Sequence, residues 1–169
     1  MTEKDIDINK ISLIVYDFDG VMTDNTVHVD QNGIESVIVN RSDGYAVARI
    51  RDLGITQIIL STEKNPVVVK RAEKLKIPVI NGVDDKKTVL CQYCCDNHIN
   101  LSEVLYVGND LNDYDAMVCV GYPCCPCDAE IEIKNISIWV STCNGGHGVI
   151  RDLFRKLCNK LSNDKITPL

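Results

Sequence analysis

Apolar residues fall in two kinds of run along the chain, and each kind predicts a different element. Residues 11–16, 55–60 and 104–107 are short, almost continuous apolar runs, which is typical of strands buried on both faces. Between them, apolar residues recur every three or four positions, as on one face of a helix. The pattern also predicts strands at 78–80, 120–122 and 136–140, and helices at about 43–53, 65–75, 84–97, 111–118, 129–134 and 149–161.

The order of these elements predicts the fold class. Strands that alternate with helices form a parallel sheet, because each connection has to cross back over the sheet. We therefore expect an α/β protein with a doubly wound, Rossmann-like parallel sheet. Two short alternating runs at 26–29 and 36–39 flank the turn sequence DQNG, so a β-hairpin flap is expected at about 24–40. Ser42 and Asp43 are expected to cap the helix that follows.

The chemically distinctive residues follow the predicted strands. The carboxyl ends of parallel strands meet at one edge of the sheet, where ligands bind. Asp17 and Asp19 follow the first strand, in the sequence DFDGVMTD. Two carboxylates directly after a buried strand are costly unless a partner neutralises them, and a divalent cation would do so. Asp17 is then expected to be an ionised nucleophile and Asp19 a general acid and base.

Two other positions carry groups suited to a phosphoryl group. Ser61 and Thr62 follow the second long strand, where a hydroxyl beside a helix N-terminus can hold a phosphoryl oxygen, although such residues also cap helices. Lys86 begins a predicted helix, where a cation is electrostatically unfavourable unless it holds an anion. Lys87 is the competing candidate, and a solvated lysine is the alternative interpretation.

An acidic and amide-rich loop, GNDLND, follows the strand at 104–107. Carboxylate and amide oxygens are the ligands that a hard cation prefers. A helix-capping loop could explain one of these residues but hardly all of them. The loop at 108–113 is therefore the second half of the predicted cation site.

Composition limits the functional classes. The 169 residues, 45% of them hydrophobic, fit one domain with a full core over residues 1–169. A net charge of −6 without a clustered basic stripe argues against nucleic acid as a partner. No apolar run approaches the roughly 20 residues that span a bilayer, so no membrane partner is expected. The polar, acidic N-terminus is unlike a signal peptide, which predicts a cytoplasmic location.

Nine cysteines raise the question of a metal site or disulfides. Cys91 with Cys94, and Cys124 with Cys127, have the internal spacing of zinc ligands. However, the first pair and Cys95 fall in a predicted helix beside apolar residues, where free cysteine behaves as a small hydrophobe. Core or surface thiols are therefore favoured over zinc, and an odd number argues against a disulfide framework.

In their order along the chain, these pieces resemble the four motifs of the haloacid dehalogenase superfamily, over about residues 11–157. The resemblance implies an aspartyl-phosphate mechanism that depends on Mg2+. Many relatives have Gly-Asp-Asp where this chain has Gly-Asn-Asp, so whether Asn109 or Asp110 is the metal ligand stays open. The resemblance implies catalytic roles for Asp17, Asp19, Ser61 and Lys86, and metal binding by Asp17, the Asp19 carbonyl and Asn109 or Asp110.

The motifs DFDGVMTD, SDGY and GGHGVIRD are similar to those of the capless phosphatases of 3-deoxy-sugar biosynthesis. These act on eight-carbon octulosonate 8-phosphate or nine-carbon nonulosonate (sialate) 9-phosphate, and the same module occurs fused to acylneuraminate cytidylyltransferases. The sequence after the second motif, TEK, is more similar to the nonulosonate branch, although a solvated amphipathic helix is the competing interpretation. The resemblance implies substrate contacts from Thr23, Thr62, Glu63, Arg71, Lys74 and Asp113.

Members of this subfamily are typically homotetramers in which neighbouring subunits replace the missing cap. The glycine-rich segment 145–148 is expected to be a mobile loop that closes over a site, and His147 is a possible substrate contact. A response-regulator receiver domain is the non-enzyme alternative. Its acidic pair is adjacent at the first strand, however, whereas here the aspartates are two residues apart.

Overall fold

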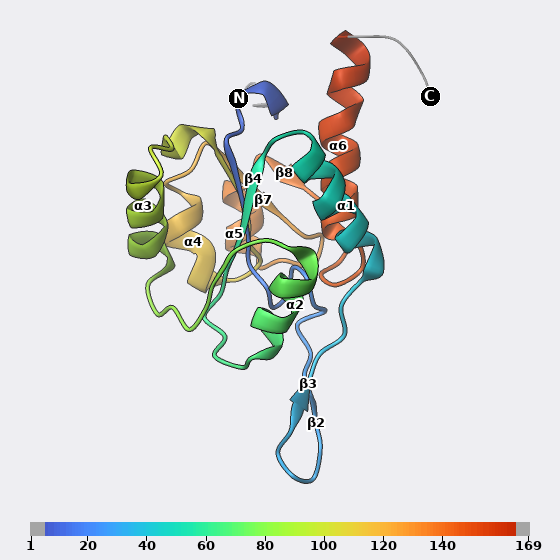
Figure 1. The fold of residues 1–169 in the computed structure, drawn as a ribbon. Coiled ribbons are helices and arrows are strands. Elements are labelled where there is room, and N and C mark those ends of the chain that lie inside the picture. The colour runs from blue at the N-terminus through green and yellow to red at the C-terminus, as the bar shows by residue number, and fades with distance from the viewer. Residues whose placement is uncertain (1–5, 165–169) are drawn as a thin grey trace.

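The computed structural model of the protein describes residues 6–164. A six-stranded parallel sheet of order β5-β4-β1-β6-β7-β8 carries helices on both faces, and a two-stranded hairpin stands apart from it (Figure 1). The predicted doubly wound α/β class is therefore confirmed. The strands are β1 (Leu13–Tyr16), β2 (His28–Val29), β3 (Glu35–Ser36), β4 (Thr56–Leu60), β5 (Val79–Ile80), β6 (Val104–Val107), β7 (Tyr122–Cys125) and β8 (Trp139–Val140). The helices are α1 (Arg41–Asp52), α2 (Val67–Leu75), α3 (Lys86–Asp96), α4 (Leu111–Met117), α5 (Ile131–Ile136) and α6 (Val149–Asp164), with 3-10 turns at Ile8–Lys10 and Leu101–Glu103.

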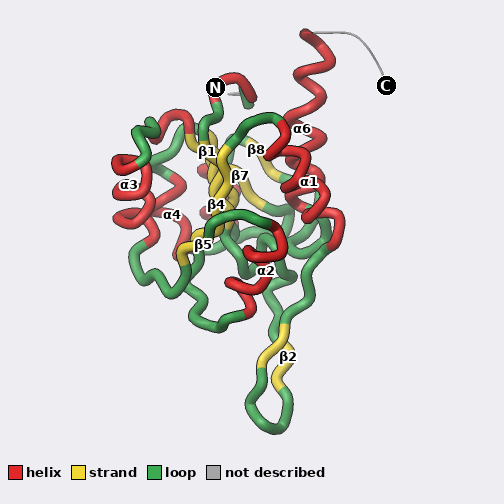
Figure 2. The backbone as a smooth tube through the Cα atoms, in the orientation of Figure 1, coloured by secondary structure: helices red, strands yellow, loops and turns green. Residues whose placement is uncertain are grey.

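The two faces of the sheet make two separate cores. Successive side chains of a strand point to opposite faces, so Ile14 and Tyr16 pack with α1, α2 and α6, whereas Leu13 and Val15 pack with α3, α4 and α5. Figure 2 shows the strands between α3 and α4 on one side and α1 and α6 on the other. Each fully buried apolar side chain of this size stabilises the fold by roughly 1.5–3 kcal/mol. The central strands are thereby held rigidly.

The register of the three central strands aligns their carboxyl ends. Tyr16, the last residue of β1, pairs with Ile59 of β4 and Val107 of β6. The residues that follow each of these strands therefore emerge at the same edge of the sheet. This alignment positions the candidate site.

The predicted hairpin projects from that edge as a flap (Figure 1). Its pairs are His28 with Ser36 and Val29 with Glu35. The paired segments are shorter than the expected 26–29 and 36–39, since all four paired residues are exposed and have no core to pack against. The amides of Asn32 and Ile34 donate to the Asp30 carboxylate, which closes the turn.

Two local predictions were wrong. Ser42 and Asp43 do not cap α1, because the Asn40 side chain accepts from the Ser42 amide at 2.9 Å and is the N-cap. The strand expected at 120–122 is β7, at Tyr122–Cys125. Its sequence YPCC has a proline and two cysteines in place of the β-branched residues that usually mark a strand.

Asp43 instead ties α1 to α6. Its side chain is 1% exposed, and its Oδ1 accepts from the Arg151 amide in the first turn of α6 at 3.1 Å. Burial raises the pKa of Asp43 to about 6, although this backbone hydrogen bond opposes the shift.

Within residues 6–164, no helix combines the length and the apolar character needed to cross a membrane.

Candidate active site

The loop after β1 brings Asp17 and Asp19 to the carboxyl edge of the sheet. Asp17 is 4% exposed, its amide donates to the Val107 carbonyl, and its Oδ1 accepts from the Phe18 amide at 2.7 Å. Gly20 turns the chain with a φ of +79°, and a Cβ there would overlap the side-chain amide of Asn109. Only glycine therefore lets the acidic loop after β6 approach the loop after β1 this closely.

A buried lysine joins the two acidic loops. Lys86 Nζ lies 2.8 Å from Asp17 Oδ1 and 2.7 Å from Asp113 Oδ1, and its side chain is almost fully buried. Lys86 is the first residue of α3, and the Asp85 side chain caps that helix by accepting from the Thr88 amide. The structure thus distinguishes between the two candidate lysines, since Lys87 is exposed.

Burial dominates the electrostatics of this cluster. Burial raises the pKa of the Asp17 carboxyl well above its usual range, and the Asp113 charge raises it further, while Lys86 opposes both effects. Burial alone would lower the pKa of Lys86, but the charges of Asp17 and Asp113 outweigh it and raise that pKa. Two carboxylates face one ammonium group, so the cluster has an excess of negative charge. A bound cation would remove that excess.

Three polar atoms lie close together: Asp17 Oδ2, the Asp19 carbonyl oxygen and one terminal atom of the Asn109 amide. One terminal atom of the Asn109 amide lies 3.2 Å from Asp17 Oδ2 and 2.8 Å from the Asp19 carbonyl oxygen. With nitrogen in this place, the amide donates a hydrogen bond to each oxygen. With oxygen there, three oxygens face one another, an arrangement that a bound cation would stabilise.

These three positions fit a small hard cation. Neighbouring ligands of an octahedral Mg2+ lie about 3 Å apart, because each is about 2.1 Å from the metal. Asp110 is exposed and caps α4, since its side chain accepts from the Leu111 amide at 2.6 Å. Asn109 is therefore better placed than Asp110 to be the third ligand. The donor set contains only one carboxylate, and among the described residues no group of three or more His, Cys, Asp and Glu could hold a metal ion.

Thr23 was expected to contact the substrate, but the structure turns it into the loop. Its side chain is fully buried, and its hydroxyl accepts from the amides of Gly20 and Asn25 at 3.2 and 3.3 Å. The same hydroxyl donates to Asp19 Oδ1 at 3.4 Å. Thr23 therefore positions Asp19 and shapes the turn, and its expected contact with the substrate stays a prediction.

Asp113 is also buried. It is 0% exposed, and its Oδ1 accepts from Lys86 and from the Tyr106 hydroxyl, the latter at 2.8 Å. Its Oδ2 accepts from the Asn109 amide at 3.0 Å. Asp113 thus orients both Lys86 and the loop after β6, and its expected contact with the substrate stays a prediction.

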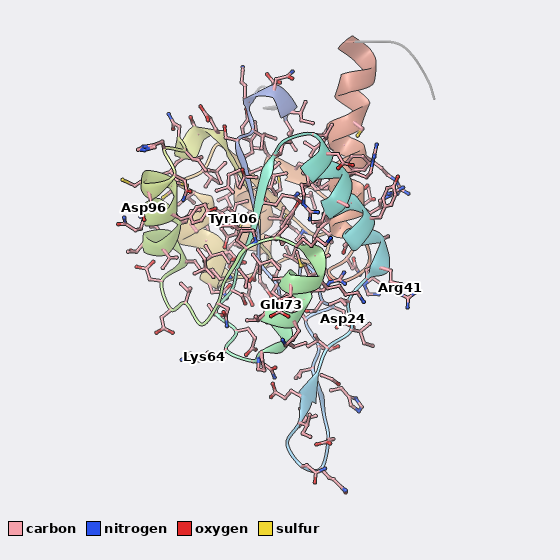
Figure 3. All side chains as sticks on the ribbon, viewed as in Figure 1. Asp24, Arg41, Lys64, Glu73, Asp96 and Tyr106 are labelled. Carbon is pink, nitrogen blue, oxygen red and sulfur yellow. The ribbon has the colours of Figure 1, made fainter. Side chains whose placement is uncertain are left out.

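Tyr106 was not identified from the sequence. It lies on β6 in the interior of the molecule (Figure 3), and burial raises its pKa well above the usual value, so the hydroxyl is a hydrogen-bond donor. Its hydroxyl is the one polar group in the run VLYV. A buried tyrosine hydroxyl requires a partner, and this requirement was the available signal.

Ser61 and Thr62 differ in their surroundings. Ser61 is 1% exposed at the end of β4, and its Oγ accepts from the Glu63 amide at 3.0 Å. Thr62 is exposed. Since β4 lies beside β1 in the sheet, Ser61 emerges next to the Asp17 loop.

The glycine-rich segment before α6 packs against the loop after β1 of its own chain. The Gly146 amide donates to the Val21 carbonyl at 3.1 Å, and a Cβ on Gly146 would lie 2.5 Å from the Asp24 nitrogen. A Cβ on Gly145 would overlap the Gly20 carbonyl. The segment was expected to be a mobile closing loop, whereas in this structure it braces residues 18–24.

A cavity of about 320 Å3 opens beside Asp19, between the flap and the loop after β4. Glu63 lines it, but Arg71 and Lys74 do not. These two line a separate groove of about 590 Å3 between α1 and α2, with Arg41 and Arg51. The structure therefore separates Glu63 from the two cations that were expected to act with it.

Together the fold and the site define a class of enzyme: a Rossmann-like hydrolase with paired aspartates after its first strand. The sequence profile of the haloacid dehalogenase-like hydrolases matches residues 51–153, which is more than half of the chain. The chain belongs to this family. None of the cysteines within residues 6–164 forms a disulfide.

Relatives narrow the class further. The chain is 27% identical over 147 residues to the 3-deoxy-D-manno-octulosonate 8-phosphate phosphatase KdsC of Haemophilus influenzae, covering 86% of this chain and 82% of that one. It is 24% identical over 165 residues to N-acylneuraminate cytidylyltransferase A of Danio rerio, covering 92% of this chain but only 38% of that protein.

Comparison with solved structures supports the same family and activity. A protein from Streptomyces avermitilis described as a HAD family hydrolase superposes with a TM-score of 0.90 and 41% identity, covering 93% of this chain and 90% of that one. The octulosonate 8-phosphate phosphatase of Moraxella catarrhalis, in complex with magnesium, phosphate and KDO, gives 0.84 and 25%, covering 94% and 95%. The prediction of a phosphatase is confirmed.

Proposed function

We propose that this phosphatase hydrolyses the phosphate ester of a 3-deoxy-2-ulosonic sugar acid, with Asp17 as nucleophile and Mg2+ as cofactor. The observation that carries the proposal is the placement of Asp17. Its Oδ1 is held by Lys86 and the Phe18 amide, and its Oδ2 faces the Asn109 amide. This arrangement fixes the carboxylate in one orientation at the open edge of the sheet, as in-line attack on phosphorus requires.

The chemistry has two steps. Asp17 attacks phosphorus while the ester P–O bond breaks, and Asp19 donates a proton to the leaving alcohol oxygen. Asp19 then accepts a proton from water, which attacks phosphorus and releases Asp17 and inorganic phosphate. Burial raises the pKa of Asp19, with the neighbouring Glu63 charge adding to the effect, which favours the protonated form for the first step. Thr23 holds this carboxyl in place.

The remaining groups would bind and orient the phosphoryl group and the metal ion. Lys86 and Ser61 would hold the phosphoryl oxygens, and Asp17, the Asp19 carbonyl and Asn109 would hold Mg2+. The ion would supply positive charge that neutralises the phosphoryl group and the buried carboxylates. The magnesium and phosphate in the Moraxella catarrhalis structure support this assignment.

The nine-carbon nonulosonate 9-phosphate is the first candidate substrate, because Glu63, Arg71 and Lys74 follow the pattern of that branch. The similarity to the octulosonate 8-phosphate phosphatases makes the eight-carbon substrate the second candidate. Comparing kcat/KM for the two phosphates tests this choice, and Thr62 is expected to contact whichever is bound. Hydrolysis of neither compound, with good turnover of an unrelated phosphate ester, would contradict the proposal.

We further propose a homotetramer in which a neighbouring copy supplies Arg71 and Lys74. In one chain these residues do not line the cavity beside Asp19, which supports their entering the site from another subunit. The flap supports assembly, since a monomer would leave its apolar side chains in water. The exposed apolar residues of the flap are Val27, Val29, Ile34 and Ile38.

Light scattering tests the assembly. The wild type should be a tetramer, and Ile38→Lys should dissociate it because a charge would enter the interface. Asp30→Asn at the tip of the flap is the control and should leave the mass unchanged. A fully active monomer would contradict this proposal.

A further inference from the structure

The cavity beside Asp19 has a chemical character that the sequence did not indicate. Its lining includes the carboxyl groups of Asp19, Glu35 and Glu63 and no lysine, arginine or histidine. Glu35 comes from strand β3 of the flap, and Glu63 from the loop after β4. Two segments far apart in the sequence thus bring acidic groups to the same cavity.

The acidic groups are fixed in their positions. Glu63 Oε1 accepts from the Asn65 amide at 2.6 Å, and the Asn65 side chain donates to Glu35 Oε2 at 3.4 Å. Asn65 therefore connects the flap to the loop after β4 and holds both carboxylates at the cavity wall. Their remaining lone pairs are available to accept hydrogen bonds from hydroxyl groups.

The leaving group of the reaction has to lie in this cavity. Asp19 lines it and is the group that protonates the leaving oxygen, so the carbons attached to that oxygen are next to the cavity wall. A hydroxyl there can donate to a carboxylate, whereas an anionic group would be repelled by two or three negative charges.

We propose that the cavity binds a neutral, hydroxylated part of the substrate directly beside the phosphate ester, and that Glu35 is a specificity residue that excludes anionic groups from this position. This inference rests on the proposed function and refines it, because it requires the carboxylate of the sugar acid to lie at the far end of the carbon chain. Arg71 and Lys74, outside the cavity, are consistent with that arrangement.

Two small esters with the same carbon skeleton provide the test. Glycerol 1-phosphate ends in a hydroxymethyl group, and 3-phosphoglycerate carries a carboxylate in its place. The wild type should favour glycerol 1-phosphate in kcat/KM by about tenfold at low salt. The preference should shrink in 0.5 M NaCl, because salt screens exposed charges and leaves steric effects unchanged.

Variants that remove one negative charge each identify the residues that cause this substrate preference. Glu35→Gln keeps the shape and the acceptor oxygen, and should lower the preference at least threefold, as should Glu63→Gln. The matched control is Glu73→Gln, because Glu73 lies on α2 (Figure 3), does not line the cavity and is paired with Lys70. It should keep the wild-type preference.

The experiments distinguish a failure of this inference from a failure of the proposed function. A wild-type ratio near one, or a ratio unaffected by Glu35→Gln and by salt, would overturn the inference even if the sugar-acid phosphate is a good substrate. Conversely, a salt-dependent preference with no turnover of either sugar-acid phosphate would support the inference and refute the proposed substrate.

Discussion

Lys86 Nζ lies between two buried carboxylates, 2.8 Å from Asp17 and 2.7 Å from Asp113. This arrangement couples the proposed nucleophile, Asp17, to the loop after β6, because Asp113 also accepts from the Asn109 amide. A single ammonium group therefore orients Asp17 and, through Asp113, the residue best placed to complete the proposed metal site. Removing Lys86 would leave two buried carboxylates without compensation, which typically costs about 3–5 kcal/mol.

Replacing Asp17 by Asn should reduce phosphatase activity to below about one per cent of wild type, because an amide is not a nucleophile. The fold should survive, since Lys86 keeps its ion pair with Asp113. Steady-state kinetics and urea unfolding measure the two properties separately. Retention of more than a few per cent of the activity would refute the assignment of the nucleophile.

Chelation should abolish activity, and Mg2+ should restore it. Asn109→Ala should raise the Mg2+ concentration for half-maximal activity by about tenfold or more, because it removes one of three ligands, whereas Asn109→Asp should lower it by adding charge. Asp110→Asn is the control, and it should change this concentration much less, since Asp110 caps α4. A metal-free enzyme with the full rate would show that the site is misassigned.

Arg71→Ala and Lys74→Ala should raise KM for the sugar-acid phosphate while leaving p-nitrophenyl phosphate hydrolysis unaffected. The generic ester shares the phosphoryl contacts but lacks the carboxylate that a cation would pair with. Lys70→Ala is the matched control, because Lys70 lies on the same helix and pairs with Glu73. If both variants treat the two substrates as the wild type does, these residues do not bind the substrate.

Asp43 should make the folded state less stable as the pH rises. Its folded pKa of about 6 lies above the ordinary value of 3.8, so the folded protein binds the proton more tightly than the unfolded chain. The stabilisation is complete below pH 4 and is lost as the pH rises through 6, by up to about 3 kcal/mol. Relative to Asp43→Asn, the wild type should therefore lose unfolding free energy between pH 4.5 and 7. Asp52→Asn, an exposed change on the same helix, should keep the wild-type slope, and an identical slope for Asp43→Asn would contradict the argument.

Gly146→Ala should slow turnover at least about tenfold, because the new methyl group would push the loop at 18–24 away from its position. Gly33→Ala provides a matched control: its φ of +78° is similar to the +69° of Gly146, but a Cβ there meets no atom within 4 Å. Both variants should lose about 1 kcal/mol of stability from backbone strain. Equal activity in the two variants would show that the contact with the loop has no catalytic role.

The positions of the chemical groups along the chain were predictable because the rules behind them are local. Short apolar runs mark buried strands, and the carboxyl ends of parallel strands share one edge. Asp17, Ser61 and Asn109 could therefore be assigned to one site before any coordinates were known. Lys86 was a candidate beside Lys87 because a cation is unfavourable in the first turn of a helix, and the burial of Lys86 separates the two.

The direction in which each side chain points depended on tertiary packing. The sequence could not show that Asp113 turns inward, because its partners Lys86 and Tyr106 come from other segments. Nor could it show that Glu35 of the flap and Glu63 share one cavity while Arg71 lies outside it. A residue's place in the chain fixes the edge of the sheet where it emerges, whereas its contacts depend on how distant segments approach one another, and here close approach requires glycines at positions 20 and 146.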